Sequence, residues 1–258
     1  RHPTKEKNMA NVGSKGEVRY VETFATDSIA GGSAGSDGTV ADGIAWLGSS
    51  DTGNSPFVRA LAAARGLHIS GATDTTDDDM VEFCGDQLMF YGQTGHSEVE
   101  ILVQFDDVTN LAFNFGFNDD VLDASNSLPM ELSGTTWTSN AATFLGFVYD
   151  VDATNDELHV MWVDDDTDAT NAIADLRFRG IAPTNSQWLY LKVEMDDRGS
   201  GNGVRATFLA VDHNGRSVEK VFNTTVDRDV ALCYYLGFEN RSGSATPVIS
   251  SSLRGCRA

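Results

Sequence analysis

Two pairs of acidic residues have the spacing that catalytic carboxylates use on a β-strand. They are Glu194 with Asp196, in the run KVEMDD, and Glu98 with Glu100, in the run SEVEI. Side chains two residues apart on a strand point to the same face, and most glycoside hydrolases use two carboxyl groups, one as the acid and one as the nucleophile or base. The position expected to hold a third carboxylate after Asp196 is Gly199. We therefore interpret both pairs as solvated acids and predict that the protein is not an enzyme.

One loop presents oxygen ligands at alternating positions. Asp150, Asp152, Asn155 and Asp156 lie in the run DVDATNDE, and a turn of this kind can surround calcium, which takes about six to eight oxygen ligands. The run lacks the glycine and the terminal glutamate of an EF-hand. The hypothesis is a structural Ca²⁺ on these four residues, and the alternative is that they are solvated turn residues. The sequence indicates no other cofactor.

The histidines and cysteines form no recognisable reactive group. No two histidines have metal-ligand spacing, and none stands near a nucleophile turn; the five are His2, His68, His96, His159 and His213. The cysteines lack the short paired spacing of a zinc site, and their odd number argues against a disulfide framework; they are Cys84, Cys233 and Cys256. We expect structural histidines, and we expect Cys84 and Cys233 to be buried in apolar strands.

Four tryptophans offer the flat apolar surface on which a sugar ring can stack. They are Trp46, Trp137, Trp162 and Trp188. Three of them lie in strand-like context, which favours packing in or beside the core. The alternative is that the tryptophans line a sugar-binding face.

The chain is strongly acidic. It has 258 residues, with Lys plus Arg 18 and Asp plus Glu 38, which gives a formal net charge of −20. Binding to nucleic acid requires clustered cationic side chains, so the charge argues against a nucleic-acid partner. No apolar run approaches the roughly 18 residues that span a bilayer, and we expect no membrane insertion. The charge is consistent with solubility, a high-salt habitat or an outward position on a crowded particle.

Short apolar runs alternate with clusters of Asp, Asn, Gly, Ser and Thr through most of the sequence. This pattern is typical of many short strands joined by surface turns. The predicted strands are 18–24, 67–70, 80–91, 98–106, 110–117, 143–150, 157–163, 174–179, 187–195, 204–211, 217–224 and 231–239. The clearest hairpin turns at 212–215, where Asp-His-Asn-Gly supplies residues that accept positive φ. The runs LAFNFGF and FLGFVY are dense in aromatic residues, and we expect them to be buried on both faces or strongly curved.

One segment gives a local helix signal. In residues 55–66, Ser55 can cap a helix, Pro56 suits its first turn and Gly66 can end it. A strand starting at Phe57 is the alternative.

The strand count predicts the fold class. About ten strands without a helical repeat indicate an all-β fold, a two-sheet antiparallel jelly-roll sandwich. Residues 1–17 are polar, and we predict a flexible N-terminal arm that orders against a partner. The remaining residues, 18–258, are expected to form a single domain.

The segment from about residue 74 to residue 212 resembles the concanavalin A-like (laminin G-like) jelly-roll domains of tailed-phage structural proteins. The resemblance rests on the runs DTTDDDMVEFCGDQLMF, LAFNFGFNDD, MELSGTTWTSNAATFLGFVYDVDA and QWLYLKVEMDD, the last followed by a hairpin. These are patterns of the fold rather than of a site. In phage proteins such domains decorate the capsid or build fibres.

The resemblance implies a non-enzymatic virion structural protein on the outer capsid surface. Its expected partners are the major capsid protein or other virion proteins, and it is expected to form a homo-oligomer on the capsid, anchored by the arm. The alternative is a carbohydrate-binding, lectin-like module that attaches to a host or surface glycan. A polysaccharide hydrolase or lyase is the third possibility, because enzymes of this kind share the fold.

Overall fold

The computed structural model describes residues 18–22, 36–39, 45–51, 53–63, 66–85, 88–119, 127–168, 177–243 and 247–257. Apart from a short 3-10 turn at Gly92–Thr94, every regular element in these ranges is a β-strand. All strand pairings are antiparallel. The prediction of an all-β sandwich is confirmed. The predicted arm, residues 1–17, lies outside the described residues.

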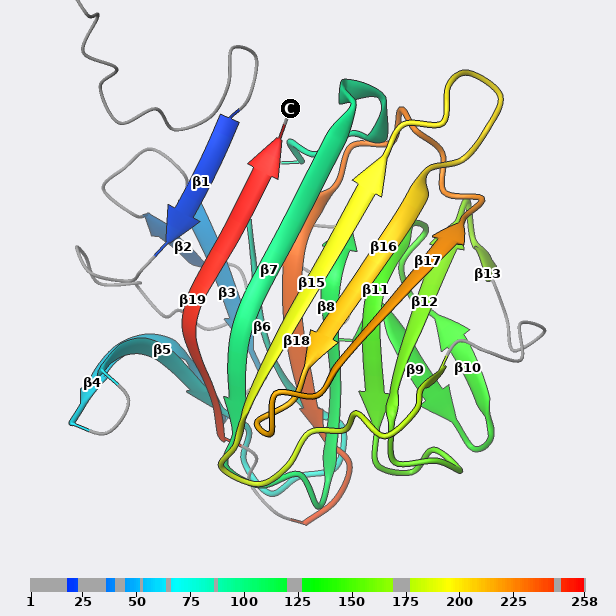
Figure 1. The fold of residues 1–258 in the computed structure, drawn as a ribbon. Coiled ribbons are helices and arrows are strands. Elements are labelled where there is room, and N and C mark those ends of the chain that lie inside the picture. Colours follow the sequence, from blue (N-terminus) through cyan, green and yellow to red (C-terminus); the bar gives the residue numbers. More distant parts are fainter. Residues whose placement is uncertain are drawn as a thin grey trace, which may run out of the picture.

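Two sheets pack face to face (Figure 1). The eight-stranded sheet has the order β17 (Ser217–Asn223), β16 (Arg205–Val211), β15 (Trp188–Asp196), β7 (His96–Phe105), β19 (Pro247–Arg257), β5 (Gly66–Ala72) and β4 (Ser55–Ala62), with β1 (Val18–Glu22) paired to β19. The nine-stranded sheet has the order β13 (Thr167–Asp168), β12 (Leu158–Asp164), β11 (Phe144–Asp150), β8 (Leu111–Asn118), β18 (Cys233–Asn240), β6 (Asp79–Gly85), β3 (Ala45–Ser50) and β2 (Ser36–Thr39), with β14 (Arg177–Phe178) paired to β12. A separate hairpin consists of β9 (Met130–Ser133) and β10 (Thr136–Ser139).

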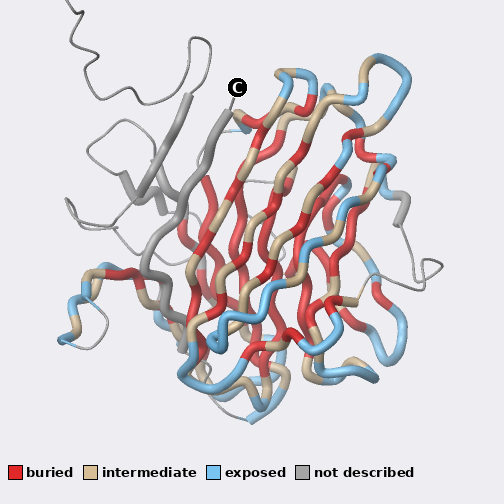
Figure 2. The backbone as a smooth tube through the Cα atoms, in the orientation of Figure 1, coloured by how far each residue is buried: buried red, intermediate tan, exposed pale blue. Residues whose placement is uncertain are grey.

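The core lies between the two sheets and is rich in aromatic rings. Phe113, in the nine-stranded sheet, meets Phe105 of the facing sheet with ring centroids 4.8 Å apart. Phe147 and Phe208 also meet across the two sheets, edge to face with ring centroids 5.5 Å apart. Such pairs stabilise a core beyond the area that they bury. Figure 2 shows buried segments running along the central strands of both sheets.

The two sheets differ in how their outer faces are covered. In β7 and β15 buried and partly exposed residues alternate along the strand, so one face is buried and the other meets solvent. In β8, β11 and β18 every residue is buried. The expectation that LAFNFGF and FLGFVY are buried on both faces is therefore confirmed, and something must cover the outer face of the nine-stranded sheet.

The predicted helix over residues 55–66 is wrong. The segment forms the edge strand β4, which pairs with β5. Phe57 is fully buried, and its ring packs against Phe83 and Phe238 with centroids 5.4 and 5.7 Å away. Pairing and burial of this ring outweigh the local capping signals, because most of the stability of a short helix comes from tertiary packing.

Two other sequence predictions, the turn at 212–215 and the burial of two cysteines, are confirmed. The turn at 212–215 joins β16 to β17, where the Asp212 carboxylate accepts hydrogen bonds from the backbone N–H groups of Asn214 and Arg216. Cys84 and Cys233 are fully buried. No helix in the described residues is long and apolar enough to cross a membrane.

Candidate functional site

The β9–β10 hairpin covers part of the outer face of the nine-stranded sheet. Asn114 of β8 holds it in place: the side-chain amide donates to the carbonyl of Met130 over 3.0 Å and accepts from the Met130 N–H over 2.8 Å. Beside this clamp a second apolar cluster fills the space between hairpin and sheet; its members are Met130, Leu132, Trp137, Ala141, Phe144, Val148, Met161 and Val163. The hairpin therefore explains why β8 and β11 are buried on both faces.

Buried carboxylates lie on the same outer face, beyond the apolar cluster. Strand register places Glu239 opposite Met80 and Ala112, and Ala112 opposite Asp150. Glu239 and Asp150 are only 2% and 1% exposed. Carboxylates are almost never fully buried unless they are paired, so the structure must supply a cation here.

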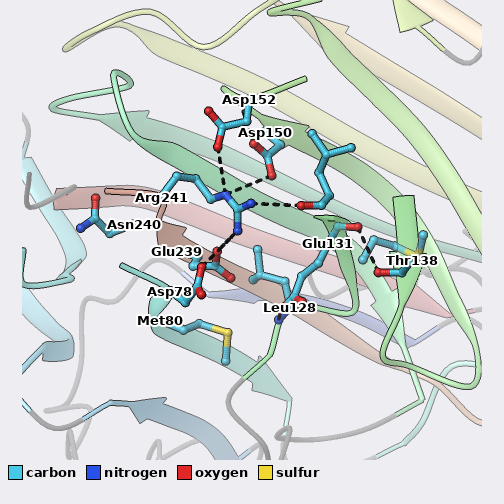
Figure 3. A network of polar contacts seen from close by, with 12 residues as sticks. Asp78, Met80, Leu128, Glu131, Thr138, Asp150, Asp152, Glu239, Asn240 and Arg241 are labelled. Carbon is cyan, nitrogen blue, oxygen red and sulfur yellow. Dashed lines mark hydrogen bonds and ion pairs between the residues drawn. The ribbon is translucent and has the colours of Figure 1, made fainter. Parts of the chain in front are cut away.

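Arg241 is that cation, and it follows directly after β18 (Figure 3). Its Nη1 donates to a carboxylate oxygen of Glu239 over 2.7 Å and lies 3.3 Å from one of Asp78. Its Nε lies 3.4 Å from Oδ2 of Asp150 and 3.6 Å from Oδ2 of Asp152. Its Nη2 donates to the carbonyl of Leu132 in the hairpin. One guanidinium thus ties four carboxylates to the hairpin that covers the sheet.

Burial raises the pKa values of three carboxyl groups in this region toward neutral pH. It raises the pKa of Glu239 to about 7, although the hydrogen bond from Arg241 opposes the shift. Burial also raises the pKa of Asp150 to about 6, against a hydrogen bond from the Asp152 N–H and the charge of Arg241. Burial and a hydrogen bond with Asp74 raise the pKa of Asp79 to about 6. These carboxyl groups can accept hydrogen bonds when ionised and donate one when protonated.

The carboxylates open into a pocket of about 640 Å³ at the border between the sheet and the hairpin. Five carboxylates and one guanidinium line it, together with small and apolar groups; the lining residues are Asp51, Asp78, Asp79, Ser127, Glu131, Leu132, Ser133, Gly134, Glu239 and Arg241. We call it the Arg241 pocket. A second hollow of about 460 Å³, lined by Asn118, Asp119 and Asn140 among others, shares Ser127 with it. A lining of this kind suits a ligand with many hydroxyl groups.

The residues of the calcium hypothesis are only partly brought together. Asp150 and Asp152 converge, but they converge on the guanidinium of Arg241. Asn155 and Asp156 are exposed. Asp150, Asp152 and Asp156 do not form a group of close ligand atoms in the described part of the chain. The calcium site stays a prediction, and a cationic side chain occupies the position between its first two residues.

The acidic strand pairs lie elsewhere, on the outer face of the eight-stranded sheet. Strand register places Glu194 directly opposite Glu98. Of the tryptophans whose side chains are described, Trp137 and Trp162 are buried and Trp188 is partly exposed on that same sheet. Packing in the core is thus confirmed for Trp162, and Trp137 of β10 packs between the hairpin and the sheet.

Sequence reasoning missed the centre of the Arg241 pocket. Arg241 and Glu239 stand in the run GFENRSG, which has no catalytic or metal-binding motif; its Asn240-Arg241-Ser242 fits only the glycosylation pattern. One signal in the sequence could have indicated the site. Glu239 and Arg241 stand on either side of Asn240 at the end of a strand that is otherwise mostly apolar. Their partners, Asp78 and Asp150, are far away in sequence and meet them only through strand pairing.

No protein-family profile and no curated protein sequence matches the chain. Solved structures do match. A protein of unknown function from Shewanella oneidensis MR-1 has a TM-score of 0.60 at 12% identity, over 93% of this chain and 86% of that one. Peanut lectin has a TM-score of 0.54 at 7% identity, over 94% and 97%. The PL-14 alginate lyase from Aplysia kurodai has a TM-score of 0.53 at 6% identity, over 78% and 87%.

These likenesses define the class of fold. The chain is a concanavalin A-like jelly roll, the fold found in lectins and in polysaccharide-degrading enzymes. The fold that the sequence resemblance implied is therefore confirmed. The likenesses carry no link to a phage capsid, and at these identities they establish the fold alone.

Proposed function

We propose that this chain is a carbohydrate-binding protein and that the Arg241 pocket holds the sugar. The observation that carries the proposal is the concentration of five carboxylates and a guanidinium in one pocket of about 640 Å³. A sugar presents many hydroxyl donors, and carboxylates are acceptors with several lone pairs each. The volume lies within the range of small-ligand sites, about 300–1,000 Å³. The likeness in fold to peanut lectin supports the same function.

The charge of the pocket selects the class of sugar. Arg241 is already engaged by Glu239, Asp78, Asp150 and Asp152, so it offers no free cation to an acidic ligand. The surplus of carboxylates repels a uronate or a sulfated chain. Neutral sugars are therefore the proposed ligands.

The test is binding of the full chain to a panel of neutral and anionic oligosaccharides, followed by calorimetry of the best ligand. Glu131→Gln and Asp78→Asn alter two pocket carboxylates that are not fully buried and should weaken binding about tenfold each, the effect of losing roughly one charge-assisted hydrogen bond. Glu219→Gln, an exposed residue of β17 on the other sheet, is the matched control. Binding only to anionic chains, or equal binding by all variants, would overturn the proposal.

We propose binding without turnover. Glu239, the most buried carboxyl group of the pocket, contacts Arg241, and so does Asp150, which is buried beside the pocket. A carboxyl held by a guanidinium is poorly placed to transfer a proton to a leaving group. Incubation of the chain with a polysaccharide panel should release no reducing ends and form no unsaturated sugars. Release that disappears in Glu239→Gln would replace this proposal with the enzyme hypothesis.

A virion role is the second proposal. The net charge of −20 and the abundance of acidic residues in turns suit an outward position on a particle. In this proposal the chain decorates the outer capsid surface as a homo-oligomer, bound to the major capsid protein through residues 1–17. Co-sedimentation of full-length and 18–258 chains with purified capsids tests it, and equal sedimentation of both would remove the arm from the proposal.

A further inference from the structure

A histidine and two glutamates meet on the solvent-facing side of β7 and β15. In the register of this pair Glu98 lies opposite Glu194, and His96 lies opposite Asp196. The intervening residues, such as Val99 and Val193, face the core and are fully buried, so these polar side chains all leave the sheet on its outer face. Like charges directly opposite each other destabilise a strand pair. A cation bound between the two carboxylates would therefore stabilise this pair of strands.

The ligand atoms are already close together. His96, Glu98 and Glu194 each offer one, and all three atoms lie within 4.8 Å of one another. Nε2 of His96 lies 3.7 Å from Oε2 of Glu98. Among the described residues no other group of His, Cys, Asp or Glu meets this condition. We propose that these three side chains bind one divalent transition-metal ion, of which Zn²⁺ is the representative.

The spacing fits such an ion. Zn²⁺ binds imidazole nitrogen and carboxylate oxygen at about 2.0–2.2 Å in tetrahedral geometry. Two ligand atoms on adjacent corners of that tetrahedron are roughly 3.4 Å apart. The separation of 3.7 Å between His96 and Glu98, and the limit of 4.8 Å for all three ligand atoms, require these partly exposed side chains to close by about 0.3 to 1.4 Å.

Asp196 prepares the histidine for this role. Its Oδ1 lies 2.9 Å from Nδ1 of His96, and its Oδ2 accepts a hydrogen bond from Arg205 over 2.9 Å. A carboxylate that accepts a hydrogen bond from Nδ1–H fixes the tautomer in which the Nε2 lone pair is free, and metal-binding histidines are commonly oriented in this way. The free nitrogen is the one that faces Glu98. Asp196 is thus a positioning residue.

Charge and ligand type select the class of metal. An imidazole binds a metal in its neutral form and each glutamate binds as a carboxylate, so two glutamates and one histidine match the charge of a divalent ion. Lys192 contacts one oxygen of Glu194, so the proposed ion would bind through the second oxygen of that carboxylate or displace the lysine. An imidazole nitrogen suits zinc and its transition-metal neighbours, whereas calcium and magnesium prefer oxygen ligands throughout. A water molecule would occupy the fourth coordination position of the ion.

The test is calorimetric titration of the full chain with Zn²⁺, and with Ca²⁺ in parallel. The wild type should bind one Zn²⁺, and His96→Ala and Glu194→Gln should each abolish that site. Asp196→Asn should weaken Zn²⁺ binding about 10- to 100-fold while leaving the stoichiometry at one. The controls are His213→Ala and Glu219→Gln, which change an exposed histidine and an exposed glutamate away from the site.

Melting temperatures of the metal-free variants show whether they remain folded, and Co²⁺ absorption in the visible range reports the imidazole and carboxylate environment independently of affinity. Wild type that takes up no Zn²⁺, unchanged Zn²⁺ binding in His96→Ala and Glu194→Gln, or equal affinity for Ca²⁺ would each overturn the proposal. None of these outcomes depends on whether the Arg241 pocket binds a sugar.

Discussion

Nη1 of Arg241 lies 2.7 Å from a carboxylate oxygen of Glu239. Glu239 lies near the end of β18, two positions before Arg241. In regular β-structure such residues share a face. Here the β9–β10 hairpin covers part of that face, so Glu239 is buried, Arg241 is only 17% exposed, and the pair needs further partners. Asp78 and Asp150 supply them from distant parts of the chain. The pair therefore organises the pocket that we assign to sugar binding.

Stability should fall as pH rises through neutrality because of Glu239. Its folded pKa of about 7 lies above its ordinary value of 4.5, so the folded state holds the proton more tightly than the unfolded state. The stabilisation is complete below about pH 4.5 and is lost as pH rises through about 7. Relative to Glu239→Gln, the wild type should lose on the order of 2–3 kcal/mol between pH 5 and pH 8. Urea unfolding at both pH values measures this, and a difference that stays constant across the range would contradict it.

Removing the guanidinium should be strongly destabilising. Arg241→Met leaves the buried carboxylates of Glu239 and Asp150 without their cation, which costs about 3–5 kcal/mol. The double variant Arg241→Met/Glu239→Gln should recover part of that loss. Arg205→Met is the control, because Arg205 pairs with Asp196 on an exposed surface, where an ion pair contributes about 0–1 kcal/mol. Denaturant midpoints compare the three proteins, and similar losses in Arg241→Met and Arg205→Met would refute the buried role.

The hairpin should loosen when its clamp is removed. Asn114→Ala deletes both hydrogen bonds to Met130 and leaves a buried backbone N–H and carbonyl without partners. The expected cost is about 2–4 kcal/mol. Hydrogen exchange should accelerate at β9 and β10 while β7 and β15 keep their protection. Uniform acceleration over all strands would show that the hairpin is not an independent unit.

Gly146 should not tolerate a side chain. It pairs with Gly116 across β11 and β8, and a Cβ at Gly146 would lie 2.4 Å from the backbone oxygen of Phe115. Gly146→Ala must push two central strands apart, so we expect a loss of more than about 3 kcal/mol or no soluble protein. Gly48→Ala is the matched control, since its Cβ would meet nothing closer than 3.8 Å. Equal thermal stability of the two variants would contradict the close approach.

Much of the fold follows from local patterns in the sequence. The alternation in SEVEILVQF and WLYLKVEMD predicts strands with one face toward a core, and β7 and β15 have that pattern. The residues at 212–215 predict a tight turn, because Asn and Gly accept the positive φ that it requires. These signals depend on neighbouring residues alone, so they predict the strands and the turn before any tertiary contact is known.

Tertiary structure decided the elements that have no local signal or a misleading one. Residues 55–66 carry helix caps, yet the segment forms a strand in which the ring of Phe57 packs against Phe83 and Phe238. The hairpin β9–β10 was not predicted, since its strands are four residues long and their cover over Asn114 is a long-range contact.

The two candidate sites show the same division. The sequence alone determined that Glu194 and Asp196, and likewise Glu98 and Glu100, share a strand face, because that relation follows from the two-residue period of a strand. Only the register of β7 against β15 decided that Glu98 and Glu194 lie opposite each other beside His96. Likewise Arg241 meets Asp150 through the pairing of β18, β8 and β11. Register is set by packing across the whole sheet, and no local run of residues encodes it.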